Sequence, residues 1–345
     1  MADKAPVWLR GAPGSPYTRK MLSVLRYRHI AYRYMIRPQG AIEGFPSPKV
    51  QLLPTFYLPG ADGALEAVVD SSPLIRRFES EYQGRSVIPT DPVLGFIDNL
   101  LEDFADEWLT KAMFHYRWAF APDIAQAAAI LPRWTAITAD DARAAELGGF
   151  FSKRQIDRLY VVGSNDITGK IIEANYVKYL DALNAHLLQH PFLMGARPGA
   201  SDFAAFGQLT QLTHFDPTPS ALTLKHAPRV YAWVEIMEDL SGLDATDAGW
   251  ITRDTLPDTL KQMLRLVGTA YLPLLLANAR AINAGEKSMT TSIDGATWTQ
   301  DVMPYQAKCL LWLRHAFADL SDADRKFVQS LLDETGCRDL ISAKV

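Results

Sequence analysis

The hydrophobic pattern changes near residue 85, and this change constrains the fold more than any other feature. Before it, short apolar or alternating segments typical of strands lie on either side of helical patterns. After it, only helical periods appear as far as residue 250. The pattern therefore predicts an α/β domain followed by an all-α helical domain.

The predicted α/β domain spans residues 1–84. It contains a helix that begins near Tyr17. This helix lies between the first two strands and forms a βαβ unit with them. A later helix is predicted to have Ser72 as its N-cap and Pro73 in its first position. The segments predicted as strands are 6–11, 31–37, Thr55–Leu58 and Ala64–Val69.

Residues 85–91 have the composition of a linker, and residues 92–250 are predicted to form the helical domain. The clearest helical periods fall in the segments Phe96–Trp118, Tyr176–Leu187, Phe203–Leu209 and Arg229–Leu240. In the first of them Leu100, Phe104 and Trp108 share a face, while Asp98 and Glu102 lie mostly elsewhere.

Residues 251–345 form a C-terminal extension. It is predicted to begin with a helix over Leu256–Ala284 and to continue with a β-hairpin that turns at Asp294-Gly295. Two more helices follow and end near Glu334.

Composition excludes several classes of protein. A net charge of −4 argues against a nucleic-acid surface, and the longest apolar run, residues 270–279, is too short to span a bilayer. The cysteines, Cys309 and Cys337, and the scattered histidines form neither a disulfide framework nor a metal site. We therefore expect a cytoplasmic protein without a metal.

Ser15 lies in the loop that joins the first strand to the first helix. Serine is a favoured N-cap, and the Pro16 that follows it suits the first helical position. The free N–H groups and the positive dipole end of such a terminus also stabilise an anion. The residues alone leave a cap and a chemical role open for Ser15, and the same holds for Asp70 and Ser71 before the later helix.

The element order and a set of motifs together resemble the cytosolic glutathione S-transferase family. The motifs are Ser15-Pro16-Tyr17, Leu53-Pro54 with Asp70-Ser71, and the segment "PFLMGARPGASDFAAFGQL" at residues 191–209. The likeness covers residues 5–240 and leaves the extension unexplained. It implies a thioredoxin-like N-terminal domain that binds glutathione as a co-substrate.

The resemblance implies that Ser15 donates a hydrogen bond to the glutathione thiolate. The thiol-transferring branches of the family carry a cysteine at this position, which forms a mixed disulfide, and a serine cannot do so. Tyr17 is the rival for the same role, although it lies inside the helix and on its apolar face.

The resemblance also assigns the residues that hold the peptide. Pro54 is expected to follow a cis peptide bond, so that the backbone of Leu53 pairs with the cysteine part of glutathione. Ser71 would bind the γ-glutamyl carboxylate and Asp70 its amino group, while Gln51 could reach the glycine carboxylate.

The second substrate of such an enzyme lies over the first helix of the helical domain. Here Trp108, Ala112 and His115 share one face of that helix and Phe114 and Trp118 another. The first set is assigned to the electrophile, and its aromatic character suggests an aromatic or flat hydrophobic molecule.

We therefore predict a glutathione transferase that conjugates a hydrophobic electrophile or cleaves an ether or halide. The alternative is a non-catalytic binding or scaffold protein of the same fold. A peroxide- or disulfide-reducing enzyme is disfavoured because no cysteine lies near the first helix. The resemblance also implies a homodimer.

Overall fold

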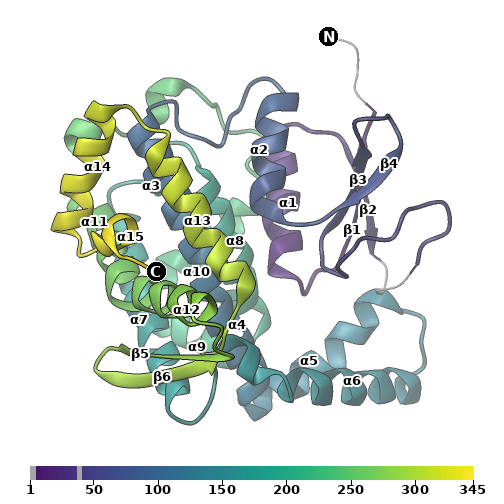
Figure 1. The fold of residues 1–345 in the computed structure, drawn as a ribbon. Coiled ribbons are helices and arrows are strands. Elements are labelled where there is room, and N and C mark those ends of the chain that lie inside the picture. The colour runs from purple at the N-terminus through teal and green to yellow at the C-terminus, as the bar shows by residue number, and fades with distance from the viewer. Residues whose placement is uncertain (1–4, 37–40) are drawn as a thin grey trace.

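The computed structural model describes residues 5–36 and 41–345 (Figure 1). The N-terminal domain has the predicted order of elements. They are β1 (Val7–Gly11), α1 (Pro16–Tyr27), β2 (Tyr32–Ile36), β3 (Thr55–Pro59), β4 (Leu65–Val68) and α2 (Ser71–Glu81). The expected end of the second strand, Arg37, lies outside the described residues.

The strands form one sheet in the order β2-β1-β3-β4. β1 and β2 are parallel because α1 crosses between them, whereas β3 is antiparallel to both β1 and β4. Figure 1 shows α1 and α2 on the side of the sheet that faces the helical domain. The starts of these two helices therefore lie where the domains meet.

The start of α2 corrects one prediction. The N-cap is Asp70 rather than Ser72, so the helix begins before the expected residue. Pro73 is tolerated inside the first turn because the N–H groups there have no partner within the helix. The N-cap of α1 is Ser15, which is one of the two roles that the sequence left open for it.

The helical domain contains the predicted helices and further ones that the sequence analysis missed, α5, α6 and α9. α3 runs through the π-helical turn η1 into α4. The elements are α3 (Pro92–Phe104), η1 (Ala105–Leu109), α4 (Thr110–Ala119), α5 (Ala121–Thr135), α6 (Asp141–Ile156), η2 (Leu159–Val162), α7 (Thr168–His186), α8 (Ala200–Leu209), η3 (Thr210–Phe215), α9 (Pro217–His226) and α10 (Pro228–Met237).

The pair α5 and α6 has no broad apolar stripe, which explains why periodicity did not reveal it. The buried residues of α6 are the small Ala144, Gly148 and Ser152. A Cβ atom on Gly148 would lie 2.1 Å from the carbonyl oxygen of Ala128, so the two helices approach closely at this glycine. Small side chains permit this approach, but they do not give the large apolar residues at helical spacing that mark an amphipathic helix in a sequence.

The extension has the predicted helices and hairpin. The long first helix is divided by the π-helical turn η6 just before Pro273, which cannot donate a backbone hydrogen bond. The short η4 (Asp247–Gly249) precedes the extension, whose elements are η5 (Arg253–Thr255), α11 (Asp258–Leu266), η6 (Val267–Tyr271), α12 (Leu272–Asn283), β5 (Ser288–Ile293), β6 (Ala296–Asp301), α13 (Pro304–Ala318), α14 (Asp322–Glu334) and α15 (Asp339–Ser342).

The extension packs against the helical domain and shares one hydrophobic core with it. The ring of Trp298 in the hairpin lies 5.6 Å from that of Trp108, and Phe317 of α13 lies 6.0 Å from Phe96 of α3. Figure 1 shows α13 alongside α3 and reaching toward α2. Within residues 5–36 and 41–345, no helix is both long and apolar enough to cross a membrane.

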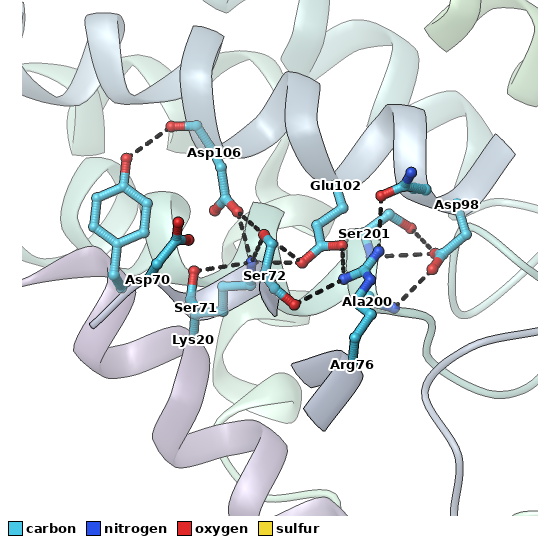
Figure 2. A network of polar contacts seen from close by, with 12 residues as sticks. Lys20, Asp70, Ser71, Ser72, Arg76, Asp98, Glu102, Asp106, Ala200 and Ser201 are labelled. Atoms are coloured by element: carbon cyan, nitrogen blue, oxygen red, sulfur yellow. Dashed lines mark hydrogen bonds and ion pairs between the residues drawn. The ribbon is translucent and has the colours of Figure 1, made fainter. Parts of the chain in front are cut away.

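Lys20 of α1 is the centre of a buried network of ion pairs between the two domains (Figure 2). Its Nζ atom lies 2.7 Å from Oε1 of Glu102 and 2.6 Å from Oδ2 of Asp106. It also donates hydrogen bonds to the hydroxyl groups of Ser71 and Ser72, at 3.2 and 3.3 Å. Burial opposes the charged form, but the two carboxylates outweigh it and raise the pKa of Lys20. The lysine therefore joins α1, α2 and α3 as a charged group.

The acidic residues of this network share one face because they follow each other at intervals of four residues along α3 and η1. Burial opposes the charge of Glu102, yet Arg76 and Lys20 hold its pKa at about 2. Asp98, at the other end, accepts hydrogen bonds from the backbone N–H groups of Ala200 and Ser201, both at 3.1 Å. The acidic residues Asp98, Glu102 and Asp106 thus contact both the N-terminal domain and the start of α8.

Close backbone contact completes the domain interface. A Cβ atom on Gly207 of α8 would lie 2.5 Å from the carbonyl oxygen of Pro16, so α1 and α8 meet at a distance that only glycine permits. The position of the α1 N-terminus relative to the helical domain is therefore fixed.

Lys111 of α4 is buried beneath the hairpin of the extension. Its Nζ atom lies 3.3 Å from Oε1 of Gln300, 3.4 Å from the carbonyl oxygen of Val162 and 5.6 Å from the centroid of the Trp298 ring. In the described part of the chain no carboxylate forms an ion pair with it. Burial lowers the pKa of Lys111 to about 8.

We expect Lys20→Met to lower the free energy of unfolding by about 3–5 kcal/mol, because Glu102 and Asp106 lose a buried cation. Urea unfolding followed by circular dichroism measures the change. The control is Lys153→Met, which breaks an exposed ion pair with Asp157 and should cost about 0–1 kcal/mol. Equal effects of the two substitutions would show that the network does not hold the domains together.

We expect Lys111→Met to stabilise the protein at pH 7 by up to about 3 kcal/mol, since it removes a buried charge. Because the pKa of Lys111 is lower in the folded protein, the unfolded chain binds more protons between pH 8 and about 10. Wild-type stability should rise through that window, and the advantage of the variant should disappear. Exposed Lys326→Met is the control, and an advantage that is independent of pH would refute this account.

Candidate functional site

Ser15 stands at the N-terminus of α1 with its hydroxyl group directed to two backbone partners. Its Oγ atom accepts a hydrogen bond from the N–H of Thr18 at 3.2 Å and donates one to the carbonyl oxygen of Leu53 at 3.3 Å. The second bond is long and therefore weak, so the hydroxyl proton can be redirected to another acceptor.

The Leu53-Pro54 segment lies beside this serine. The peptide bond between Leu53 and Pro54 is cis, as the resemblance implies. Gln51, which precedes this segment, is exposed, and its Oε1 atom accepts a hydrogen bond from the guanidinium group of Arg10 at 3.1 Å. The structure thus brings Ser15 and Leu53 together and leaves Gln51 at the edge of the same surface.

Asp70 and Ser71 stand at the start of α2, on the other side of Lys20 from α3 (Figure 2). The Ser71 hydroxyl accepts a hydrogen bond from Lys20, whose positive charge adds to that of the helix N-terminus. Asp70 has a φ of 84°, and its Oδ2 atom accepts a hydrogen bond from the hydroxyl of Tyr305 at 2.9 Å. Tyr305 belongs to α13, so the extension reaches the predicted glutathione site.

Tyr17 does not share the environment of Ser15. Its hydroxyl group donates a hydrogen bond to the backbone carbonyl of Asp106 at 2.8 Å, within the π-helical turn η1. Burial, with Glu107 and Asp106 nearby, raises the pKa of Tyr17 well above its usual value. The Tyr17 hydroxyl therefore serves the contact between the domains.

The helical domain holds the loop before Ser15 through polar contacts. Arg117 of α4 donates a hydrogen bond to the carbonyl oxygen of Gly14 at 3.0 Å, and Gln211 donates to that of Pro13 at 3.1 Å. The guanidinium group is fixed by Asp216, with Nε 2.9 Å from Oδ1. Arg117 is buried and already paired, so it orients the loop rather than offering a free charge.

Apolar side chains of α5 lie against the same loop. A Cβ atom on Gly14 would lie 2.6 Å from Leu131 and 2.8 Å from Trp134, which shows how closely both approach. Trp134 contacts Phe215, with ring centroids 5.0 Å apart, and all three side chains are partly exposed. They form an apolar wall beside Ser15, which we call the α5 wall.

The residues assigned from the sequence to the electrophile have another environment. Trp108, Ala112 and His115 are 4%, 4% and 5% exposed. Trp108 packs on the hairpin, and the His115 ring lies 2.8 Å from the hydroxyl of Ser164 and 3.3 Å from the carboxylate of Glu173. This face of η1 and α4 is covered by the hairpin of the extension and by the segment from η2 to Ser164, which does not favour the assignment.

Several residues near the site escaped the sequence analysis. Lys20 follows Tyr17 by three residues and precedes Val24 by four, so it falls on the buried face of α1, and a lysine at such a position was the available signal. Trp134 and Tyr305 gave no signal, because only the tertiary fold brings α5 and α13 to the N-terminal domain. Cys309 and Cys337 are both buried.

Comparison with known proteins places this arrangement in a family. A sequence profile described as glutathione S-transferase, N-terminal domain, matches residues 9–86, and one described as glutathione S-transferase, C-terminal domain, matches residues 140–235. No curated protein matches the sequence.

The solved structures that match this chain share little sequence with it. A glutathione S-transferase from Methylobacterium radiotolerans in complex with glutathione sulfonate is 18% identical, with 68% of this chain and 91% of that chain covered and a TM-score of 0.40. A family member from Pseudomonas fluorescens with bound S-(propanoic acid)-glutathione is 17% identical, with 71% and 100% covered and a TM-score of 0.37. Poplar glutathione transferase F1 is 16% identical, with 69% and 95% covered and a TM-score of 0.41.

The two profiles together match half of the chain, and the four-stranded sheet followed by a helical domain agrees with the fold they describe. The chain belongs to the glutathione S-transferase family.

Proposed function

We propose that the protein is a glutathione transferase in which Ser15 stabilises the thiolate of bound glutathione. The observation that carries the proposal is the position of the Ser15 hydroxyl, at the N-terminus of α1 and 3.3 Å from the Leu53 carbonyl oxygen. A thiolate beside this terminus meets a hydroxyl donor and the positive end of the helix dipole, which together favour the anion.

The peptide part of glutathione binds along the segment from Gln51 to Ser71 in this proposal. The backbone of Leu53 pairs with the cysteine part, and Gln51 is offered to the glycine carboxylate. The γ-glutamyl carboxylate lies at the start of α2, where the Lys20 charge beneath Ser71 adds to its attraction. The carboxylate of Asp70 then faces the amino group.

The electrophile lies against the α5 wall in this proposal, rather than on Trp108, Ala112 and His115. Leu131 and Trp134 approach the Gly14-Ser15 loop and are partly exposed, so an apolar molecule can cover them. The glutathione thiolate attacks the electrophilic carbon and forms a thioether. In a substitution the leaving group departs with the electron pair of the broken bond, and the thiol proton passes to solvent.

Homodimerisation stays a prediction of the resemblance, and a cytoplasmic location stays a prediction of the composition. The alternative, a scaffold without turnover, is distinguished by the first experiment below, because such a protein need not lower the pKa of the thiol.

We expect the pKa of enzyme-bound glutathione to be about two units below the free-thiol value of about 8.5, which corresponds to about 2.7 kcal/mol. Ser15→Ala should restore most of that difference. Ultraviolet absorbance of the thiolate across pH measures both values. Ser321→Ala is a matched control, because Ser321 is an N-cap with the same 3.2 Å bond to the helix N–H but lies on α14. Equal thiol pKa values in wild type and Ser15→Ala would reduce Ser15 to a cap, and no binding would favour the scaffold.

We expect Trp134→Ala to raise the KM for chlorodinitrobenzene about tenfold, or about 1.4 kcal/mol, because the apolar contact is lost. The KM for glutathione should stay unchanged. Steady-state kinetics with each substrate varied separately test this. His115→Gln serves as the comparison. If His115→Gln raises the KM for the electrophile and Trp134→Ala does not, the electrophile lies on the face of α4 that carries His115.

A further inference from the structure

A small acidic cavity lies where α2, α3 with η1, and α13 meet. Its volume is about 40 Å³, above the roughly 10–15 Å³ that one water molecule requires. It has room for a small polar head group. Carboxylates of α3 and η1 line one side and aromatic side chains of α13 the other, namely Glu102, Asp103, Asp106, Glu107, Tyr305 and Trp312.

The carboxylates of the cavity outnumber the cations that face them. Glu102 is paired with Lys20 and Arg76, and Asp106 with Lys20. Asp103 and Glu107 have neutral donors instead, the Tyr271 hydroxyl at 2.7 Å and the Gln306 amide at 3.2 Å. In the part of the chain that the structure describes, no lysine or arginine forms an ion pair with either. Burial and the neighbouring carboxylates raise the pKa of Asp103 to about 7 and that of Glu107 to about 8, so a cation bound between them would favour their charged forms.

One buried carboxylate oxygen of the cavity has no hydrogen-bond donor in the described part of the chain. Asp106 is 6% exposed, and its Oδ2 atom is used by Lys20 and Ser72. Its Oδ1 atom is buried and has no hydrogen-bond partner among residues 5–36 and 41–345. A buried acceptor of this kind costs free energy unless a donor reaches it, and a bound ligand with N–H groups would supply one.

The aromatic side of the cavity is partly open to solvent. Tyr305 and Trp312 are 38% and 43% exposed, and their rings meet edge to face with centroids 6.0 Å apart. Aromatic faces attract organic cations and also cover alkyl chains. Because Tyr305 hydrogen-bonds Asp70, this mouth of the cavity adjoins the start of α2.

We propose that the cavity binds the primary ammonium group of an alkyl amine, with the group among Asp103, Asp106 and Glu107 and the alkyl chain against Tyr305 and Trp312. An ammonium group has three N–H donors. They can reach Oδ1 of Asp106, which has no donor in the described part of the chain, and the carboxyl groups of Asp103 and Glu107, whose hydrogen-bond donors are uncharged. A metal ion is a poorer candidate, since the described residues contain no group of three or more histidine, cysteine or acidic side chains able to hold one.

This site goes beyond the proposed transferase activity, and it does not rest on glutathione binding. The ammonium group can come from a free amine or from the amino terminus of a peptide thiol held at Asp70. The two sources share their chemistry and are separated by the experiment.

The test uses butylammonium chloride and measures the thermal unfolding midpoint of the full chain without glutathione. Sodium chloride at the same ionic strength and neutral butanol are the controls. A ligand that binds only the folded state raises the midpoint in a saturable way. Glu107→Gln keeps the volume and the bond to Gln306 but removes a carboxyl group that a bound cation would hold in its charged form, and exposed Glu146→Gln is its matched control. Trp312→Ala tests the alkyl contact.

We expect a saturable rise with butylammonium alone, and a dissociation constant at least tenfold higher in Glu107→Gln and raised in Trp312→Ala. A response equal to that of sodium chloride, or an unchanged constant in Glu107→Gln, would overturn the proposal. Repeating the titration with saturating glutathione identifies the source. Loss of butylammonium binding assigns the cavity to the peptide amino terminus, and retained binding assigns it to a separate amine.

Discussion

The ammonium group of Lys20 is the interaction on which the rest of the structure depends. It lies between Glu102 and Asp106 of the helical domain and supports the hydroxyl groups of Ser71 and Ser72 at the start of α2. A buried cation between two carboxylates adds little net stability, because the cost of removing these charges from water offsets much of their attraction. Its main effect is to fix the relative positions of the helices that carry the charges. It fixes the start of α2 relative to α1, and the Asp70-Ser71 pair therefore has one position relative to Ser15.

The extension adds a second constraint from the opposite side. The hairpin covers Trp108, and α13 lies along α3 and η1, where it shields the remaining carboxylates and places Tyr305 on Asp70. Surfaces of α3 and α4 that would otherwise face solvent are thereby interior. This is the reason for proposing the α5 wall as the site of the electrophile, since Trp134 and Leu131 remain partly exposed while Trp108 and His115 do not.

Local signals in the sequence predicted what depends on local structure. Ser15 and Pro16 mark a helix start by their own chemistry, and Asp294-Gly295 marks a tight turn, so both were found. The interval of four residues between Asp98, Glu102 and Asp106 was visible, but an acidic stripe normally faces solvent, and only the fold shows that it is buried. The contacts of Trp134 and Tyr305 depend on elements far apart in the chain. No periodicity encodes them, and α5 and α6 lack the apolar stripe that would have predicted them.

The hydrogen bond between Tyr305 and Asp70 also has a consequence for synthesis of the chain. The N-terminal domain leaves the ribosome first and can fold as a unit, but the side of its site at Asp70 is finished only when α13 emerges. The ring of Trp108 remains uncovered until the hairpin emerges, and the acidic face of α3 remains uncovered until α13 follows. During synthesis there is therefore a period in which the sheet of the N-terminal domain is formed while the charged and aromatic surfaces of the helical domain are not yet covered by the hairpin and α13.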